Sequence, residues 1–349
     1  MDIKVKVSQR LRADIETIAL CSIGEQVSET DFSNIQKQAS FRDAKYNIEY
    51  LASAIEIDSV VNFKAYILWL RDILRTYDIE DIMLINHLKR ITDYVVSNYP
   101  NEYWATIEHF ISEGMSSILH DKIGIISHLD NNDKHALLAR DYFNALLEMN
   151  KNKAIKIVLE VVEKNEISII DLYLNVFTLV LYEIGQYWAT RKITVGHEHF
   201  ATAVTDYTMS LLYDKIFNND EKKHKMIGVC VGDELHEIGI RMVCDIFELN
   251  HWDTYYLGAN VPNESVLNEI KKIKPDILAI SATLANKVPA CIELIDIIKR
   301  ECSRVKIIVG GLPFNIDKNL WKFVDADGYS ADANEAVRIA SLLIGEKHE

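Results

Sequence analysis

The chain has few of the residues that build covalent or metal cross-links. Its cysteines number five among 349 residues, and no two of them form a C-x-x-C pair. A disulfide framework or a cysteine zinc site is therefore not expected. Scattered thiols in an odd number are typical of a reducing compartment, so we expect a cytoplasmic protein. The five are Cys21, Cys230, Cys244, Cys291 and Cys302.

Positive charge and long apolar runs are also scarce. The 38 Lys and Arg residues face 52 Asp and Glu residues, which gives a formal net charge of −14. Nucleic-acid binding requires clustered basic residues that displace counterions, and no such stripe is present. The N-terminus has no apolar signal core, and no stretch approaches the roughly 18 uninterrupted apolar residues of a membrane span. We expect neither a nucleic-acid partner nor a membrane partner.

Residues 1–127 show helical periodicity throughout. Within "VVNFKAYILWLRDIL", Val60, Phe63, Ile67 and Leu70 recur at the spacing of one helix face. No helix-turn-helix signature accompanies them. We interpret this segment as a helical domain for output or dimerisation, which implies a homo-oligomer and a separate signalling partner protein.

Residues 128–217 form a second helical segment. The polar stretch "HLDNNDKHA" at 128–136 interrupts the first pattern, and four helical patterns with short connections follow it. Such a series predicts an antiparallel four-helix bundle. In its last helix, the spacing of Phe200, Val204, Tyr207 and Leu211 predicts that these side chains face the core.

The periodicity changes after a polar linker at 218–225. Short, continuously apolar runs such as "KMIGVCV", "DILAIS" and "VKIIVGG" alternate with helical segments. This alternation predicts a Rossmann-like parallel sheet covered by helices over 225–349. The expected fold class is therefore multidomain α plus α/β. In open parallel sheets, ligands bind at the carboxyl ends of the strands.

A polar motif follows the first apolar run of this sheet. The stretch "VGDELHEIG" places Glu234, His236 and Gly239 in the pattern E-x-H-x-x-G. It contains neither a G-x-G-x-x-G fingerprint nor a phosphate-binding P-loop. A metal-bound imidazole is commonly oriented by a carboxylate on its other nitrogen, and Glu234 could orient His236 in this way. Taken alone, the motif is a weak signal and favours a surface or capping histidine.

Small residues follow two later strands. Ser281 and Thr283 come at the end of the third apolar run, and Gly310 and Gly311 end the fourth. The chain then reaches "ADGYSADANEAV", which contains Tyr329. Each residue has an ordinary role as a helix cap or a turn residue. Together they would leave a deep slot beside the sheet.

In this order the motifs resemble the cobalamin-binding Rossmann-like domain. That family has a D/E-x-H-x-x-G loop, an S-x-L/T sequence after the third strand and G-G after the fourth. The resemblance implies that His236 replaces the cofactor's own base as the lower cobalt ligand, and that the displaced nucleotide tail fills the slot. The other cofactor-binding residues that it implies are Glu234, Gly239, Ser281, Thr283, Gly310, Gly311 and Tyr329.

A second resemblance lies in the bundle. Trp188 is followed, after nine residues, by Glu198 and His199, and this W-x9-E-H pattern resembles the CarH-type adenosylcobalamin photoreceptors. It implies that the bundle caps the upper face of cobalamin, with Trp188 against the adenosyl group and Glu198 and His199 nearby.

The chain departs from those photoreceptors in two ways. They begin with a basic DNA-binding domain, whereas this chain begins with an unmatched helical segment. They also carry a histidine directly after the tryptophan, where this chain has Ala189. A bis-histidine photoproduct is thereby in doubt, although His197 and His199 are candidate substitutes.

We therefore expect a cobalamin-binding light sensor that is not an enzyme and that uses adenosylcobalamin as its switch. Its N-terminal helices would signal to a separate partner. One alternative is a corrinoid methyl carrier of a methyltransferase system, which would prefer methylcobalamin and an open upper face. Another is a light-independent cobalamin sensor.

Overall fold

The computed structural model describes residues 2–29, 34–121, 126–129, 134–217 and 221–345. The described chain forms two compact units, which we consider one at a time. The first unit comprises 1–123 together with 282–293 and 312–325. The second comprises 124–281, 294–311 and 326–349. All five strands and the helical bundle belong to the second unit.

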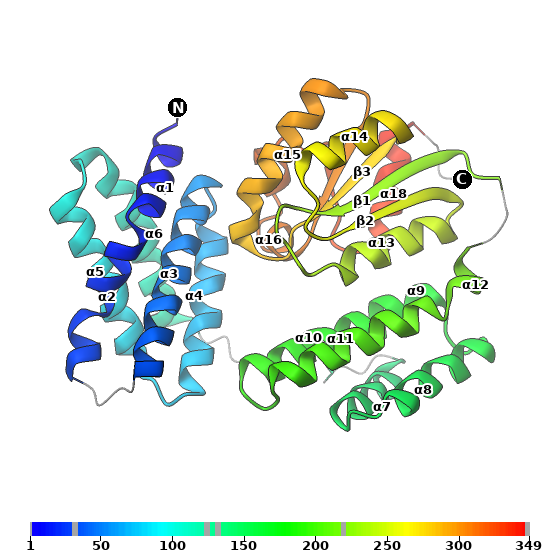
Figure 1. The fold of residues 1–349 in the computed structure, drawn as a ribbon, viewed down its shortest axis with the longest axis horizontal. Coiled ribbons are helices and arrows are strands. Elements are labelled where there is room, and N and C mark those ends of the chain that lie inside the picture. Colours follow the sequence, from blue (N-terminus) through cyan, green and yellow to red (C-terminus); the bar gives the residue numbers. More distant parts are fainter. Residues whose placement is uncertain (1, 30–33, 122–125, 130–133, 218–220, 346–349) are drawn as a thin grey trace. The chain divides into compact units, whose positions relative to one another are not determined.

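The first unit is built mainly from six helices (Figure 1). Phe63 and Ile67 of the predicted stripe are 1% and 0% exposed, so this face does form a core. A Cβ atom on Gly114 would lie 2.9 Å from the Phe63 ring, which shows how closely the helices approach. The six helices are α1 (Ile3–Ala13), α2 (Ile15–Glu29), α3 (Asn34–Glu56), α4 (Val60–Arg75), α5 (Asp81–Asn98) and α6 (Asn101–His120).

The first unit also contains residues 288–293, which begin the helix α15 (Val288–Glu301), and three short helices: η2 (Ala285–Lys287), α16 (Leu312–Ile316) and α17 (Leu320–Phe323). Inside this unit, the hydroxyl of Ser59 donates a 2.7 Å hydrogen bond to Asp317. The buried amide of Asn62 donates to the carbonyl of Pro313 at 3.2 Å.

A four-helix bundle opens the second unit. Its third helix, 169–189, runs through a π-helical segment in which the Thr178 hydroxyl donates to the carbonyl of Tyr173 at 2.8 Å. Residues 130–133 of the predicted boundary lie outside the described residues. The elements are α7 (Ala136–Leu147), α8 (Lys151–Glu163), α9 (Ile169–Leu172), η1 (Tyr173–Phe177), α10 (Thr178–Ala189), α11 (Val195–Ser210) and α12 (Tyr213–Ile216).

The predicted core face of α11 is partly wrong. Val204 is buried, but Tyr207 and Leu211 are 51% and 41% exposed. Two threonines take core positions instead, because the Thr205 and Thr208 hydroxyls donate to carbonyls one turn earlier and need no other partner. The predicted stripe is therefore in the core at Val204, is partly buried at Phe200, and is exposed at Tyr207 and Leu211.

Within the described part of the chain, the helix Ile169–Ala189 is the one long and apolar enough to cross a membrane by length and composition. Core helices of soluble proteins pass the same test. Here the helix lies in the bundle, with Leu172, Val176, Val180 and Ile184 at most 1% exposed. Its apolar character is explained by packing, and no membrane assignment follows from it.

The sheet is parallel with strand order β2-β1-β3-β4-β5. This arrangement confirms the predicted multidomain α plus α/β fold class. Helices α13 (Ile238–Leu249) and α18 (Ala333–Leu343) pack together on one face, and α14 (Asn263–Ile273) and α15 (Val288–Glu301) cover the other (Figure 1). The strands are β1 (His224–Cys230), β2 (Trp252–Gly258), β3 (Ile277–Ser281), β4 (Lys306–Gly310) and β5 (Gly328–Tyr329).

The predicted linker at 218–225 differs from the structure at its C-terminal end. Its residues 218–220 lie outside the described residues, and its last two residues already belong to β1. In β1, a Cβ atom on Gly228 would lie 2.4 Å from the Cys244 sulfur, so glycine is required for α13 to pack on this strand.

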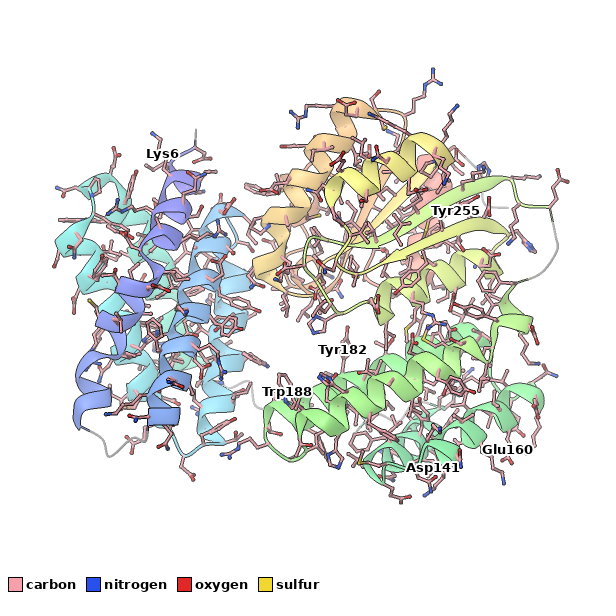
Figure 2. The ribbon with its side chains drawn as sticks, viewed as in Figure 1. Lys6, Asp141, Glu160, Tyr182, Trp188 and Tyr255 are labelled. Atoms are coloured by element: carbon pink, nitrogen blue, oxygen red, sulfur yellow. The ribbon has the colours of Figure 1, made fainter. Side chains whose placement is uncertain are left out.

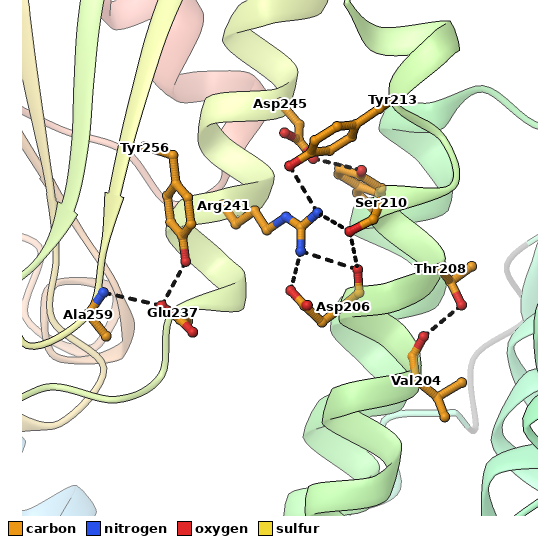
Figure 3. Close-up of polar contacts among 11 residues, drawn as sticks. Val204, Asp206, Thr208, Ser210, Tyr213, Glu237, Arg241, Asp245, Tyr256 and Ala259 are labelled. Carbon is orange, nitrogen blue, oxygen red and sulfur yellow. Dashed lines mark hydrogen bonds and ion pairs between the residues drawn. The ribbon is translucent and has the colours of Figure 1, made fainter.

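Polar contacts join α13 to the bundle inside the second unit (Figure 3). The Arg241 guanidinium pairs with the Asp206 carboxylate and donates to Ser210 Oγ at 2.8 Å and to the Tyr213 hydroxyl at 3.0 Å. One turn further along α13, Asp245 accepts a 2.8 Å hydrogen bond from the Tyr173 hydroxyl. Burial raises the pKa of Asp245 to about 6. Helix α13, which begins directly after the His236 loop, is therefore held against the bundle by these polar contacts.

Asp245 should make stability pH-dependent. Because the pKa of Asp245 in the folded protein lies above its ordinary value of 3.8, the native state binds the proton more tightly than the unfolded state. This contribution is present at low pH and is lost as pH rises through about 6, at a cost of about 2–3 kcal/mol. Urea unfolding at several pH values measures the free energy of unfolding. This free energy should fall more steeply with rising pH in the wild type than in Asp245→Asn.

Asp253→Asn is the matched control, because Asp253 also accepts a 2.8 Å bond from a tyrosine hydroxyl, that of Tyr255. It controls for the loss of a tyrosine–carboxylate pair. Parallel stability profiles for the wild type and Asp245→Asn between pH 4 and 7 would contradict the prediction.

Candidate functional site

The loop after β1 is shaped by a buried carboxylate. Gly232, at φ +53°, turns the chain as it leaves the sheet. Glu234 then lies 1% exposed, and its Oε1 atom accepts from the backbone N–H groups of Leu235 at 3.0 Å and His236 at 3.2 Å. The same oxygen contacts Nδ1 of His236. A buried carboxylate must be hydrogen-bonded, so these contacts fix the loop conformation.

The geometry suits His236 to metal coordination. Its Nδ1 atom is directed at Glu234, so coordination would use Nε2, which is the usual arrangement of a carboxylate-oriented metal ligand. The His236 side chain is 59% exposed. Its carbonyl accepts a 3.6 Å contact from the thiol of Cys230 at the end of β1. The imidazole is thus oriented from the buried side and presented at the surface.

Glu237 and Tyr256 belong to the same edge, and neither was identified from the sequence. The Tyr256 hydroxyl donates to Glu237 Oε2 at 2.8 Å, and the backbone N–H of Ala259 donates to it at 3.2 Å (Figure 3). Burial and the Glu237 carboxylate raise the pKa of Tyr256. Gly258 adopts φ +79°, with Glu237 3.1 Å from the position of a Cβ atom. In the sequence, the only signal that could have identified Glu237 as a site residue is its position next to His236.

The ends of the other strands lie in register with this loop. Cys230 pairs with Ser281, and Ser281 pairs with Gly310 across the sheet. Gly311 has φ +113°, a conformation that favours glycine. A Cβ atom on Gly310 would lie 3.4 Å from the carbonyl of Ser330. Three predicted residues are thus brought to one edge of the sheet.

Three predicted residues occupy other positions. Gly239 is exposed in the first turn of α13, where a Cβ atom would meet nothing within 4 Å. Tyr329 lies on β5 opposite Val309. Thr283 follows the end of β3 by two residues and belongs to the first compact unit.

The bundle residues form two separate groups. Trp188 lies near the end of α10 and is 48% exposed. Glu198 and His199 lie in the first turn of α11, where His199 Nδ1 is 2.6 Å from Glu198 Oε2 and the Thr202 hydroxyl donates to Glu198 Oε1 at 3.0 Å. Among the described contacts, no hydrogen bond or ring contact joins Trp188 to this pair.

One more aromatic residue shares the exposed side of α10. Tyr182 is 51% exposed, and it was not identified from the sequence. Figure 2 places Tyr182 and Trp188 on the side of α10 that faces the sheet domain. The Nδ1 atom of the candidate substitute ligand His197 lies 2.9 Å from the Thr194 hydroxyl.

A single oriented histidine, His236, suits a metal that is already bound in a macrocycle. No group of three or more His, Cys, Asp or Glu side chains within the described ranges could hold a metal ion. One oriented imidazole would hold a bare ion poorly. Cobalamin brings most of its cobalt ligands with it, and His236 would supply the one donor that comes from the protein, so the residues fit cobalamin.

Comparison with known protein families tests this interpretation. Two models, each described as a B12 binding domain, match the chain. One covers residues 224–338, which contain the sheet and the His236 loop, and the other covers residues 138–213 of the bundle. The chain is a cobalamin-binding protein. Both the sheet domain and the bundle therefore have a counterpart in known B12-binding proteins. Residues 1–137 lie outside both matches.

Similar curated proteins are corrinoid proteins. Dimethylamine corrinoid protein 3 of Methanosarcina acetivorans is 27% identical over 216 residues, which are 59% of this chain and 97% of that protein. The trimethylamine corrinoid protein of Methanosarcina barkeri is 24% identical over 46% of this chain and 76% of its own length.

A solved structure agrees at the level of the fold. The monomethylamine corrinoid protein of Methanosarcina barkeri superimposes with a TM-score of 0.53 at 20% identity, over 59% of this chain and 98% of that one.

These comparisons confirm the cobalamin part of the sequence interpretation. The relatives named above are methylamine corrinoid proteins, and they do not support the CarH-type resemblance. Light sensing and the individual roles of the site residues stay hypotheses.

We expect His236 to provide the lower cobalt ligand. His236→Ala should lose the base-off, histidine-on absorption spectrum and bind cobalamin more weakly. Glu234→Gln should act more mildly, with about a 10–100-fold loss of affinity through imidazole orientation. His109→Ala, which changes an exposed histidine of α6, is the control. An unchanged spectrum in His236→Ala would refute the assignment.

Proposed function

We propose that this chain is a corrinoid carrier that accepts a methyl group and delivers it within a methyltransferase system. The observation that carries the proposal is the similarity to dimethylamine corrinoid protein 3, because the chain covers 97% of that relative. Methylated amines are chemically suitable methyl donors, and the names of several relatives refer to them.

The residues of the site suit a carrier. Bound cobalamin supplies a cobalt centre to which a methyl group can be attached and from which it can be removed. Glu234 holds the imidazole of His236 in one orientation, so His236 would hold the cobalt of the cofactor. Tyr182 and Trp188 offer exposed apolar surface on the bundle side. The chain itself would then be no enzyme, and a methyltransferase partner in the cytoplasm would supply catalysis.

A light sensor is the second candidate. One observation favours it: the six helices of the first unit lie outside the residues that the family models match. In that account adenosylcobalamin is the bound form, Trp188 shields its adenosyl group, and the N-terminal helices signal to a separate protein. The same extension could dock a methyltransferase, so we favour the carrier.

The two functions predict different results. With cobalamin reduced to the cob(I) form, a dimethylamine-dependent methyltransferase and dimethylamine should convert the bound cofactor to methylcobalamin, as followed by absorbance. Omitting dimethylamine is the control. Green light should leave the light-scattering mass of the adenosylcobalamin-loaded protein unchanged.

Light-dependent change of mass without any methylation would contradict the carrier and support the sensor. If neither response occurs, a light-independent cobalamin sensor becomes the better account.

A further inference from the structure

Two segments that follow strands of the sheet belong to the unit of the N-terminal helices. Residues 282–293 begin directly after β3, and residues 312–325 begin directly after Gly311, yet both group with residues 1–123 in the first compact unit. Both segments also lie within residues 224–338, which match a B12 binding domain. The N-terminal helices, which lie outside that match, are therefore built together with parts of the cofactor-binding region.

The start of helix α4 holds the second of these segments. Helix α4 contacts α16. The hydroxyl of Ser59 donates to Asp317 at 2.7 Å, and the side-chain amide of Asn62 donates to the carbonyl of Pro313 at 3.2 Å and to Ser59 Oγ at 2.9 Å. Ser59 and Asn62 are 1% and 2% exposed, so these hydrogen bonds are shielded from water.

Ser59 occupies the position where a serine normally caps its own helix. It is the N-cap residue of α4, but its side chain makes no capping hydrogen bond to that helix. A capping serine usually accepts from a backbone N–H group of the first turn and thereby stabilises the helix. Here the hydroxyl group bonds to Asp317 and Asn62 instead. Helix α4 therefore lacks a stabilising cap at the end that contacts α16.

Asn62 is also unfavourable for the packing of the first unit alone. Its Oδ1 atom is buried and accepts no hydrogen bond from the described residues, and burying such an acceptor destabilises the folded protein. An apolar side chain of similar size would pack there without this penalty. The asparagine adds the Nδ2 group, which donates to Pro313 and Ser59. The position of α16 explains both polar residues.

The position of α16 bears on the cofactor site through the chain itself. Helix α16 begins directly after Gly311, which has φ +113°, and Gly310 pairs with Ser281 at the edge of the sheet. A displacement of α16 must therefore change the backbone at Gly311. The first segment has a similar link, because α3 contacts η2, which begins two residues after Thr283.

We propose that Ser59 and Asn62 are positioning residues for cobalamin binding, and that the N-terminal helices thereby sense whether the cofactor is bound. The two side chains fix α16, and α16 fixes the backbone at Gly310 and Gly311. Such coupling is reciprocal: bound cobalamin strengthens these contacts by the same factor by which the contacts strengthen cobalamin binding. The inference rests on cobalamin binding and does not depend on whether the chain is a methyl carrier or a sensor.

The test uses the full chain and hydroxocobalamin. Ser59→Ala, Asn62→Leu and the double variant remove the contacts, and Ser59→Thr keeps the hydroxyl group. Ser117→Ala is the matched control, because Ser117 is a buried serine of the same unit whose hydroxyl donates within its own helix, to the carbonyl of Gly114 at 2.7 Å. Absorbance titration measures affinity, urea unfolding measures stability without cofactor, and amide hydrogen exchange reports on α4.

Ser59→Ala and Asn62→Leu should each lower the affinity for hydroxocobalamin by about 2–10-fold, the effect of losing a buried hydrogen bond. Ser59→Thr should bind as the wild type does. Ser117→Ala should lower stability and leave the affinity unchanged. Hydroxocobalamin should slow amide exchange in α4 of the wild type by about 2–10-fold, and this slowing should disappear in the double variant.

Three results would overturn the proposal. Wild-type affinity in both single variants would mean that the contacts only stabilise the first unit. A loss of affinity in Ser117→Ala as large as that in Ser59→Ala would mean that any destabilisation of this unit weakens binding. Unchanged exchange in α4 of the wild type on addition of hydroxocobalamin would mean that the helices do not sense the cofactor. If the double variant fails to fold, the single variants decide the exchange experiment. No methyl donor is used, so the methyl-transfer experiment is unaffected.

Discussion

The site depends on one buried charge. Glu234 is 1% exposed at the end of a strand, where an unpaired carboxylate would be severely destabilising. Its hydrogen-bond partners come from the next two residues, so satisfying the charge winds the loop around it and points His236 outward. Helix α13 starts directly after this turn. The conformation of the loop and the orientation of the imidazole therefore have one physical cause.

Helix α13 transmits this constraint to the bundle. Arg241 and Asp245 follow His236 by five and nine residues, and both make their polar contacts with bundle residues. Apolar packing accompanies them, since Met242 and Ile246 share one core with Val176 and Val180. The bundle and the sheet domain consequently belong to one compact unit, which contains both B12-matched regions apart from residues 282–293 and 312–325 of the first unit.

Sequence patterns predicted the parts that are local in the chain. Alternating apolar runs and helical segments gave the parallel sheet, and the spacing E-x-H-x-x-G identified the loop, because these features are encoded within a few residues. The bundle was harder. Helical spacing of Tyr207 and Leu211 indicates a stripe, yet it does not say whether that stripe faces the core or the surface. Tyr182 carried no local signal, and the Arg241–Asp206 pair joins residues 35 positions apart.

The most direct test of the account asks whether the axial nitrogen on cobalt comes from the protein. Cobalamin of natural isotopic composition, reduced to the cob(II) form, would be bound to protein labelled uniformly with 15N and examined by electron paramagnetic resonance. A histidine of the chain as lower ligand predicts the doublet splitting of a 15N nucleus. The triplet splitting of 14N would show that the cofactor keeps its own base, which would contradict the role assigned to His236.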